Sequence, residues 1–259
     1  MKAGTGLTDQ RRLSMIWPRA VWRLGRALVH ALAGLGTILL RFPRMNAPLR
    51  EARVQAWALK MLMLLGVRLE LRGHPPVAGP VLLVANHISW LDILVMHAAR
   101  HCRFVSKADV RHWPLIGTLA NGAGTLYIER ESRRDAMRVV HHMSDSLKRG
   151  EIVAVFPEGT TSDGVTLLPF HGNLIQAAIS AGSPVQPVAL SFLDTSTRAT
   201  SLAPCYIGDD TLVGSIWRTL AARSITAVVH YGKSQTAQGR DRRTWARELR
   251  SAVDALRQA

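Results

Sequence analysis

The chain has 259 residues, 47% of them hydrophobic, and a formal net charge of +15. This length is enough to bury a sizeable core in one or two domains. Its two cysteines, Cys102 and Cys205, fit neither a disulfide framework nor a cysteine-based metal site, and suit a reducing compartment or simple core packing.

The basic excess is concentrated in the first 80 residues, where 13 lysine and arginine residues stand against three acidic ones. Such an excess favours nucleic acid or an anionic membrane surface as a partner. Here the charges alternate with long aliphatic runs and few aromatic residues, whereas nucleic-acid platforms combine basic with stacking aromatic side chains. The pattern therefore favours a membrane interface over nucleic acid.

Residues 27–40 form the first predicted helix, which is apolar except for His30 and Thr37 and is bracketed by Arg26 and Arg41. A helix of this length spans about 21 Å, short of a hydrocarbon core of about 30 Å. The pattern indicates a weak spanning segment or a deep interfacial helix. A signal peptide is not expected, because no small-residue cleavage site follows.

A second helix is predicted at about 50–66, with Arg50, Arg53 and Lys60 on one face and apolar residues elsewhere. We therefore expect residues 1–73 to form a basic, membrane-associating segment of two helices. The alternative is a buried helical hairpin of a soluble domain. Membrane association is favoured, because neither helix has enough polar surface to be solvated on both sides.

Residues 74–259 are predicted to form an α/β domain with a central, mainly parallel or mixed sheet flanked by helices, because short β-rich runs alternate with helical stretches. The predicted strands are 81–85, 102–106, 125–128, 151–155, 185–191 and 225–231. The predicted helices are 90–100, 114–121, 132–149, 172–181, 212–222 and 242–257. Sites in such sheets lie beyond the carboxyl ends of the strands. Three segments rich in polar and charged residues occur at or after predicted strand ends.

The first such segment is "NHISWLD", residues 86–92. On a continuous helix His87 and Asp92 would lie about 140° apart, but a helix that begins after Ser89 lets their side chains meet. Asp92 would then orient the imidazole of His87 as a general base. The alternative is a helix cap, since Ser89 and Asp92 have capping-box spacing. The segment alone does not separate the two.

The second segment is "GTLYIER", residues 124–130. Arg130 follows a predicted strand, and its planar guanidinium suits a phosphate or carboxylate. Lys107 ends another strand and is a second candidate cation. The alternative for Arg130 is a surface salt bridge to Glu129 or Glu131.

The third segment is "FPEGTTSDG", residues 156–164. Gly159 allows backbone to approach a ligand, Glu158 is a candidate acceptor for hydroxyl groups, and Thr160 adds a donor. A hydrophilic turn is the alternative, although this one follows a wholly apolar strand.

Other chemistries have little support in the sequence. It contains no G-x-S-x-G elbow, no P-loop and no G-x-G-x-x-G after a strand. His97 and His101 have helical i,i+4 spacing but lack a carboxylate in ligand spacing, so no metal site and no cofactor are expected.

Together these segments resemble the glycerolipid acyltransferases typified by 1-acylglycerol-3-phosphate (lysophosphatidic acid) acyltransferases. Four blocks occur in the family's order over residues 75–195: "NHISWLD", "GTLYIER" with Tyr127 for phenylalanine and Glu129 for aspartate, "FPEGTTS", and "VQPVAL". Many members carry a lysine after the phenylalanine of "LLPFHGN", where this chain has His171.

The resemblance implies that His87, oriented by Asp92, activates the free hydroxyl of a lysophospholipid, which attacks the thioester of acyl-carrier protein or acyl-CoA. It implies that Arg130 and Lys107 bind the acceptor phosphate. Glu158, Gly159 and Thr160 would position the glycerol, with phosphatidic acid as the product.

The resemblance also implies a membrane location, at the cytoplasmic face of the inner membrane. Two alternatives remain. One is an acyltransferase for another lysolipid, such as an amino-acid (ornithine-type) lysolipid, as His171 suggests. The other is a non-catalytic basic module that binds membrane or nucleic acid.

Overall fold

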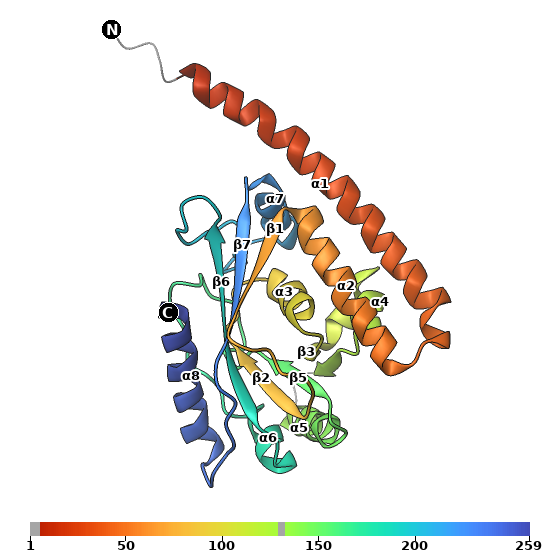
Figure 1. The fold of residues 1–259 in the computed structure, drawn as a ribbon, viewed down its shortest axis with the longest axis vertical. Helices are drawn as coiled ribbons and strands as arrows, with labels where there is room; N and C mark the ends of the chain where they lie inside the picture. Colours follow the sequence, from red (N-terminus) through yellow and green to blue (C-terminus); the bar gives the residue numbers. More distant parts are fainter. Residues whose placement is uncertain (1–5, 129–132) are drawn as a thin grey trace.

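The computed structural model of the chain describes residues 6–128 and 133–259. Seven strands form one sheet in the order β1-β7-β6-β2-β5-β3-β4 (Figure 1). The strands are β1 Val67–Arg72, β2 Val81–Ala85, β3 Arg103–Lys107, β4 Leu126–Ile128, β5 Ile152–Val155, β6 Val185–Asp194 and β7 Ile225–Tyr231.

Five of the strands, β6, β2, β5, β3 and β4, run parallel to one another, and β7 and β1 run the opposite way as a parallel pair. The predicted mainly parallel or mixed sheet is confirmed. Its edge strand β1 was not predicted: its residues lie before position 74, in the segment that the sequence assigns to the membrane helices. The division into two domains at 73/74 stays a prediction.

Helices cover both faces of the sheet. The helices are α1 Gly6–Leu40, α2 Ala47–Leu65, α3 Leu91–Ala99, α4 Ile116–Gly122, α5 Arg133–Lys148, α6 Gln176–Ala181, α7 Leu212–Ala221 and α8 Arg242–Gln258, with short 3₁₀ turns at Phe42–Arg44 and Ala108–His112. One core lies between the sheet and α1, α2, α3 and α7, and a second core lies between the sheet and α5, α6 and α8. Figure 1 shows α8 and α2 on opposite sides of the sheet.

The register of the central strands β2 and β5 explains why the polar segments that follow them lie at one edge of the sheet. All residues of β2 and β5 are buried, as expected for parallel strands covered on both faces. Val84 at the end of β2 is in register with Val155 at the end of β5. The segments that follow the two strands, 86–92 and 156–164, are therefore neighbours in space.

Helices α1 and α2 form a tightly packed hairpin. Nε2 of His30 lies 3.0 Å from the carbonyl oxygen of Trp57, and Nε1 of Trp57 donates to the carbonyl of His30 at 3.1 Å. The two rings stack with centroids 5.3 Å apart. A Cβ atom on Gly34 would lie 2.5 Å from Trp57 Nε1, so only glycine allows this approach.

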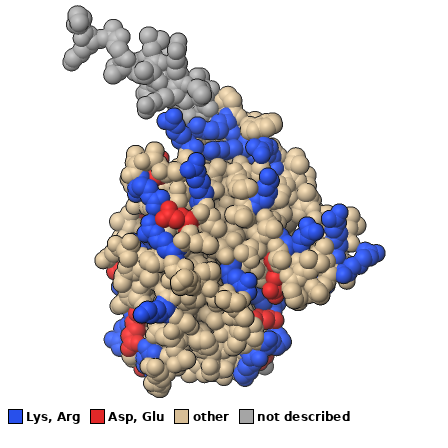
Figure 2. All heavy atoms as spheres, in the orientation of Figure 1, with Lys and Arg blue, Asp and Glu red and all other residues tan. Residues whose placement is uncertain are grey.

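Helix α1 is longer than predicted, with 35 residues instead of 14. Its stretch Trp17–Leu40 is the one described helix long and apolar enough to cross a membrane, and its 24 residues extend over about 36 Å. One side packs on α2, α4 and α7. Large apolar side chains on α1 remain exposed: Trp17, Val21, Trp22, Leu28, Val29, Leu32, Leu39 and Leu40. Figure 2 shows basic side chains scattered around this hairpin, with few acidic ones.

Candidate active site

The central pair is His87 and Asp92, which lie where β2 ends and α3 begins. Nδ1 of His87 is 2.7 Å from Oδ2 of Asp92. The Asp92 side chain is fully buried, whereas that of His87 is 20% exposed. The contact that the sequence predicts is present, because the chain turns between strand and helix.

The carboxylate of Asp92 also closes the turn that starts α3. Its Oδ2 accepts backbone N–H groups of Ile88 at 2.6 Å and Ser89 at 2.9 Å. The Ser89 hydroxyl accepts from the backbone of Leu91 at 3.2 Å and donates to the carbonyl of Pro204. Half of the predicted capping box is therefore present, and the same carboxylate serves the cap and the histidine. The two interpretations of "NHISWLD" are not exclusive.

The ring of His87 is fixed in one orientation. Because a carboxylate only accepts hydrogen bonds, we assign the ring proton to Nδ1, which leaves a lone pair on Nε2. The ring stacks on Phe156, with centroids 4.1 Å apart and planes 6° from parallel. Phe156 in turn stacks on Phe104. The arrangement presents Nε2 as a base at a half-buried position.

The backbone of His87 is held by the neighbouring loop. Its N–H donates to Oε2 of Glu158 at 2.5 Å, and its carbonyl accepts from the backbone of Ser162 at 2.8 Å. Oε1 of Glu158 accepts from the backbone of Leu168 at 3.1 Å. Both oxygens of this carboxylate, which belongs to a residue only 4% exposed, thus anchor backbone. Its predicted role toward substrate hydroxyls stays a prediction.

Burial raises the pKa of Glu158, while the hydrogen bonds from the amides of His87 and Leu168 act in the opposite direction. The amides favour the ionised carboxylate because they donate to it. The side chain therefore has the properties of a structural acceptor placed beside the base.

Gly159 and Thr160 lie on the exposed side of the same turn. Gly159 has φ +74°, a left-handed conformation that favours glycine. A Cβ at Gly159 would make only an ordinary contact, 3.8 Å, with the ring of His171. The backbone of His171 donates to the carbonyl of Pro157 at 2.8 Å. His171 therefore borders the turn that was predicted to position the acceptor.

The candidate cation Lys107 lies farther along the same sheet edge. Lys107 at the end of β3 is in register with Ile128 at the end of β4. Arg130 follows two residues later and lies outside the described residues. Lys107 pairs with Asp109 at 2.5 Å, and both side chains are more than half exposed. Such a surface pair is worth about 0–1 kcal/mol, so a phosphate could replace Asp109 at little cost. Phosphate binding by both cations stays a prediction.

Asn86 is a site residue whose role the sequence did not indicate. Its buried side-chain amide donates to the carbonyl of Leu190 at 3.0 Å and accepts from the N–H of Leu190 at 2.8 Å. It thereby ties the end of β2 to β6 immediately before His87. The partner is 104 residues away, which no local pattern reveals.

The remaining histidines and cysteines do not form a metal site in the described part of the chain, where no three His, Cys, Asp or Glu side chains gather suitably. Burial lowers the pKa of His97 to about 3 and that of His101 to about 4. The ring of His97 packs edge-on against Phe104. Cys102 and Cys205 are free and buried.

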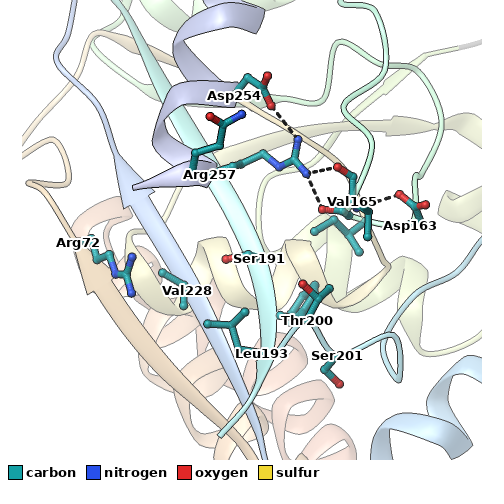
Figure 3. Close-up of a pocket in the computed structure, with 14 residues that line it drawn as sticks. Arg72, Asp163, Val165, Ser191, Leu193, Thr200, Ser201, Val228, Asp254 and Arg257 are labelled. Carbon is teal, nitrogen blue, oxygen red and sulfur yellow. Dashed lines mark hydrogen bonds and ion pairs between the residues drawn. The ribbon is translucent and has the colours of Figure 1, made fainter. Parts of the chain in front are cut away.

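His87 lines neither of two cavities nearby, although Ile88 lines the first and Asp163 lines both. A polar cavity of about 300 Å³ lies between the sheet and the end of α8 (Figure 3). In it Arg257 donates to the carbonyls of Gly164 and Val165 and pairs with Asp254. A mainly apolar cavity of about 540 Å³ lies between the 202–210 loop and α7.

Comparison with known proteins agrees with this geometry. Residues 67–191 match the family model named Acyltransferase. The lyso-ornithine lipid O-acyltransferase of Pseudomonas aeruginosa is 36% identical over 241 residues, 91% of this chain and 92% of the relative. The 1-acyl-sn-glycerol-3-phosphate acyltransferase of Neisseria gonorrhoeae is 35% identical over 210 residues, 80% of this chain and 81% of the relative.

The fold has a solved counterpart. The crystal structure of the 1-acyl-sn-glycerophosphate acyltransferase of Thermotoga maritima superimposes with a TM-score of 0.69, covering 95% of this chain and 96% of that one, at 17% identity. That likeness supports the sheet order and the covering helices. The sequence matches above lead to one conclusion: the chain belongs to the acyltransferase family whose members act on lysophospholipids and related lysolipids.

Proposed function

We propose that the protein transfers a fatty acyl group from a thioester to the free hydroxyl of a lysolipid, with His87 as general base. The 2.7 Å contact between His87 and Asp92 carries this proposal. Nε2 takes the hydroxyl proton as the oxygen attacks the thioester carbonyl. The carbon–sulfur bond then breaks, and the imidazolium, stabilised by Asp92, returns the proton to the leaving thiolate. No acyl-enzyme is needed.

The donor in this proposal is acyl-carrier protein or acyl-CoA, since both present the acyl group as a thioester. The basic surface suits either one, because carrier proteins are acidic and coenzyme A carries phosphates. A large part of the rate comes from holding two substrates in one geometry.

The first candidate acceptor is 1-acylglycerol-3-phosphate, which gives phosphatidic acid. Arg130 and Lys107 follow neighbouring strands and would bind its phosphate. Gly159 and Thr160 are exposed beside the base and would position the glycerol, with Glu158 holding the turn between them and His87.

The second candidate acceptor is a lyso-ornithine lipid. Two observations favour it besides the Pseudomonas relative. The loop 156–164 contains no lysine or arginine that could bind a phosphate. The hydroxyl of Thr161 in this loop donates to the carbonyl of Tyr206, so this side chain faces the protein interior. The neighbouring residue at the turn is His171, not a lysine. An amino-acid headgroup needs fewer fixed cations than a phosphate does.

We also propose that α1 attaches the protein to the cytoplasmic face of the inner membrane. Eight large apolar side chains of its stretch Trp17–Leu40 are exposed, a grouping typical of a membrane or protein interaction site. Arg19 and Arg23 of α1 donate to carbonyls at the end of α7, so α1 is attached along its side to the α/β domain. This geometry favours a helix lying in the interface over one that crosses the bilayer.

A substrate panel tests these assignments. Purified protein on vesicles would be offered lysophosphatidic acid or lyso-ornithine lipid, each with acyl-carrier-protein and acyl-CoA donors. We expect transfer to at least one acceptor and a loss of at least 1000-fold in His87→Ala, whose thermal unfolding should stay close to that of the wild type. A non-catalytic module that binds membrane or nucleic acid would transfer nothing. Retained activity in His87→Ala would rule out the histidine-base mechanism.

A further inference from the structure

Residues 86–92, which connect β2 to α3 and are called the catalytic turn below, contact a small buried polar network. The carbonyl of Pro204 accepts from the hydroxyls of Ser89 and Ser215, the latter at 3.0 Å. The Ser215 hydroxyl also accepts from Nε1 of Trp90 at 3.1 Å. Ser89 and Ser215 are fully buried. Ser215 of α7 thus contacts Trp90 directly and shares the carbonyl of Pro204 with Ser89, the residue before it.

The other end of α7 is held by α1. The last carbonyls of a helix have no partners within it. Arg23 donates to the carbonyls of Leu220 at 2.9 Å, Ala222 at 2.6 Å and Arg223 at 3.2 Å. Arg19 donates to that of Ala221 at 2.7 Å. A cation at this end also interacts favourably with the helix dipole.

The two sets of contacts lie on one ten-residue helix, a rigid rod of about 15 Å. We propose that α7 couples the membrane-associating helix α1 to the catalytic turn. Arg23 sets the position of α7, and Ser215 transmits this position directly to Trp90 and, through the carbonyl of Pro204, to Ser89. Ser215 is then a positioning residue for His87. The proposal rests on the proposed acyl transfer for its kinetic consequence, not for its structural one.

The coupling matters because the turn and the base share one carboxylate. Asp92 accepts both the N–H of Ser89 and Nδ1 of His87. A displacement of Ser89 therefore displaces the acceptor that orients the ring. Misplacing a catalytic group by about 1 Å can cost about 100-fold in rate.

Hydrogen exchange of the full chain on vesicles tests the structural part. Ser215→Ala should raise exchange in residues 87–92 at least fivefold. Its matched control is Thr219→Val, because the Thr219 hydroxyl is equally buried on α7 but donates to the carbonyl of Ser215 within the helix. Arg23→Met should raise exchange both in 212–222 and in 87–92. Its control is Arg26→Met, since Arg26 lies over the ring of Trp22 on its own helix.

Kinetics on the same vesicles test the functional part. Ser215→Ala and Arg23→Met should each lower kcat about tenfold and change KM for donor and acceptor less than twofold, with both controls near wild type. If Arg23→Met loosens α7 and leaves 87–92 unchanged, the coupling is wrong. If Ser215→Ala loosens 87–92 and kcat stays constant, the positioning role is wrong. Should the wild type transfer no acyl group, the proposed function fails, while the exchange data still decide the coupling.

Discussion

Replacing Asp92 with asparagine tests whether the proposed mechanism needs a negative charge beside His87, because the two side chains have almost the same shape. The carboxylate of Asp92 accepts three hydrogen bonds on Oδ2, from His87 and from the amides of Ile88 and Ser89. The amide oxygen of asparagine can still accept from the two backbone groups, so the turn should persist. What disappears is the negative charge beside the imidazolium.

The expected magnitudes follow from these contacts. A hydrogen bond to a charged acceptor contributes roughly 1 kcal/mol more than one to a neutral acceptor, so three bonds lose up to about 3 kcal/mol. The lower desolvation cost of a neutral side chain offsets part of this loss. We expect the free energy of unfolding to fall by about 1–2 kcal/mol. The rate should suffer more, because an equivalent change in a Ser-His-Asp triad costs about 10⁴ in kcat.

The assay is steady-state release of free thiol from the acyl donor, paired with denaturant unfolding of the same sample. Asp194→Asn is the matched control: this carboxylate also accepts two backbone amides, of Ser196 and Thr197, but in an exposed loop. We expect kcat to fall at least 100-fold in Asp92→Asn and to stay within twofold in the control. A folded Asp92→Asn protein with kcat within tenfold of wild type would refute the reasoning.

Three further outcomes are expected. Because the folded-state pKa of Glu158 is raised, the stability of the wild type relative to Glu158→Gln should be greatest below the ordinary glutamate pKa of 4.5 and should fall as pH rises through the folded-state pKa. Denaturant unfolding from pH 4 to pH 7 measures this difference in free energy of unfolding, and a pH-independent difference would contradict the reasoning. Gly159→Ala and Gly150→Ala place alanine at φ +74° and +82° with little steric obstruction, so each should lose about 1 kcal/mol of stability, yet only Gly159→Ala should change KM for the acceptor. Gly34→Val should separate α1 from Trp57 and lower the free energy of unfolding by about 1–3 kcal/mol, and an unchanged denaturation midpoint would show that the helices do not need this close approach.

Hydrophobic runs and their flanking polar residues predicted the central strands and the polar segments that follow them. The apolar runs at 81–85 and 152–155 predicted β2 and β5 within a residue, and the rule that sites form beyond the carboxyl ends of strands predicted that segments 86–92 and 156–164 lie at one edge of the sheet. The edge strand β1 was missed although its apolar and charged residues alternate; its partner β7 lies 158 residues away, so no neighbouring segment indicated the pairing. The start of α6 was set four residues too early.

The supporting contacts were beyond sequence reasoning for a related reason. Asn86 with Leu190 and Ser89 with Pro204 join residues more than 100 positions apart. Arg23, one of the basic residues of the N-terminal segment, caps α7. Long-range partners of this kind follow from tertiary packing, which the periodicity of either segment does not encode.

The backbone anchoring of His87 bears on how this scaffold can change its choice of acceptor. The amide and carbonyl of the histidine are held by Glu158 and by the main chain of Ser162, so the two exposed positions between them, 159 and 160, do not fix the base through their side chains. Under the proposed mechanism, substitutions of Thr160 or His171 would alter headgroup preference while the contacts that hold His87 stay in place. A fold with this separation can diversify among lysolipids by a few surface substitutions, and the naming of its relatives after two different acceptors fits that route.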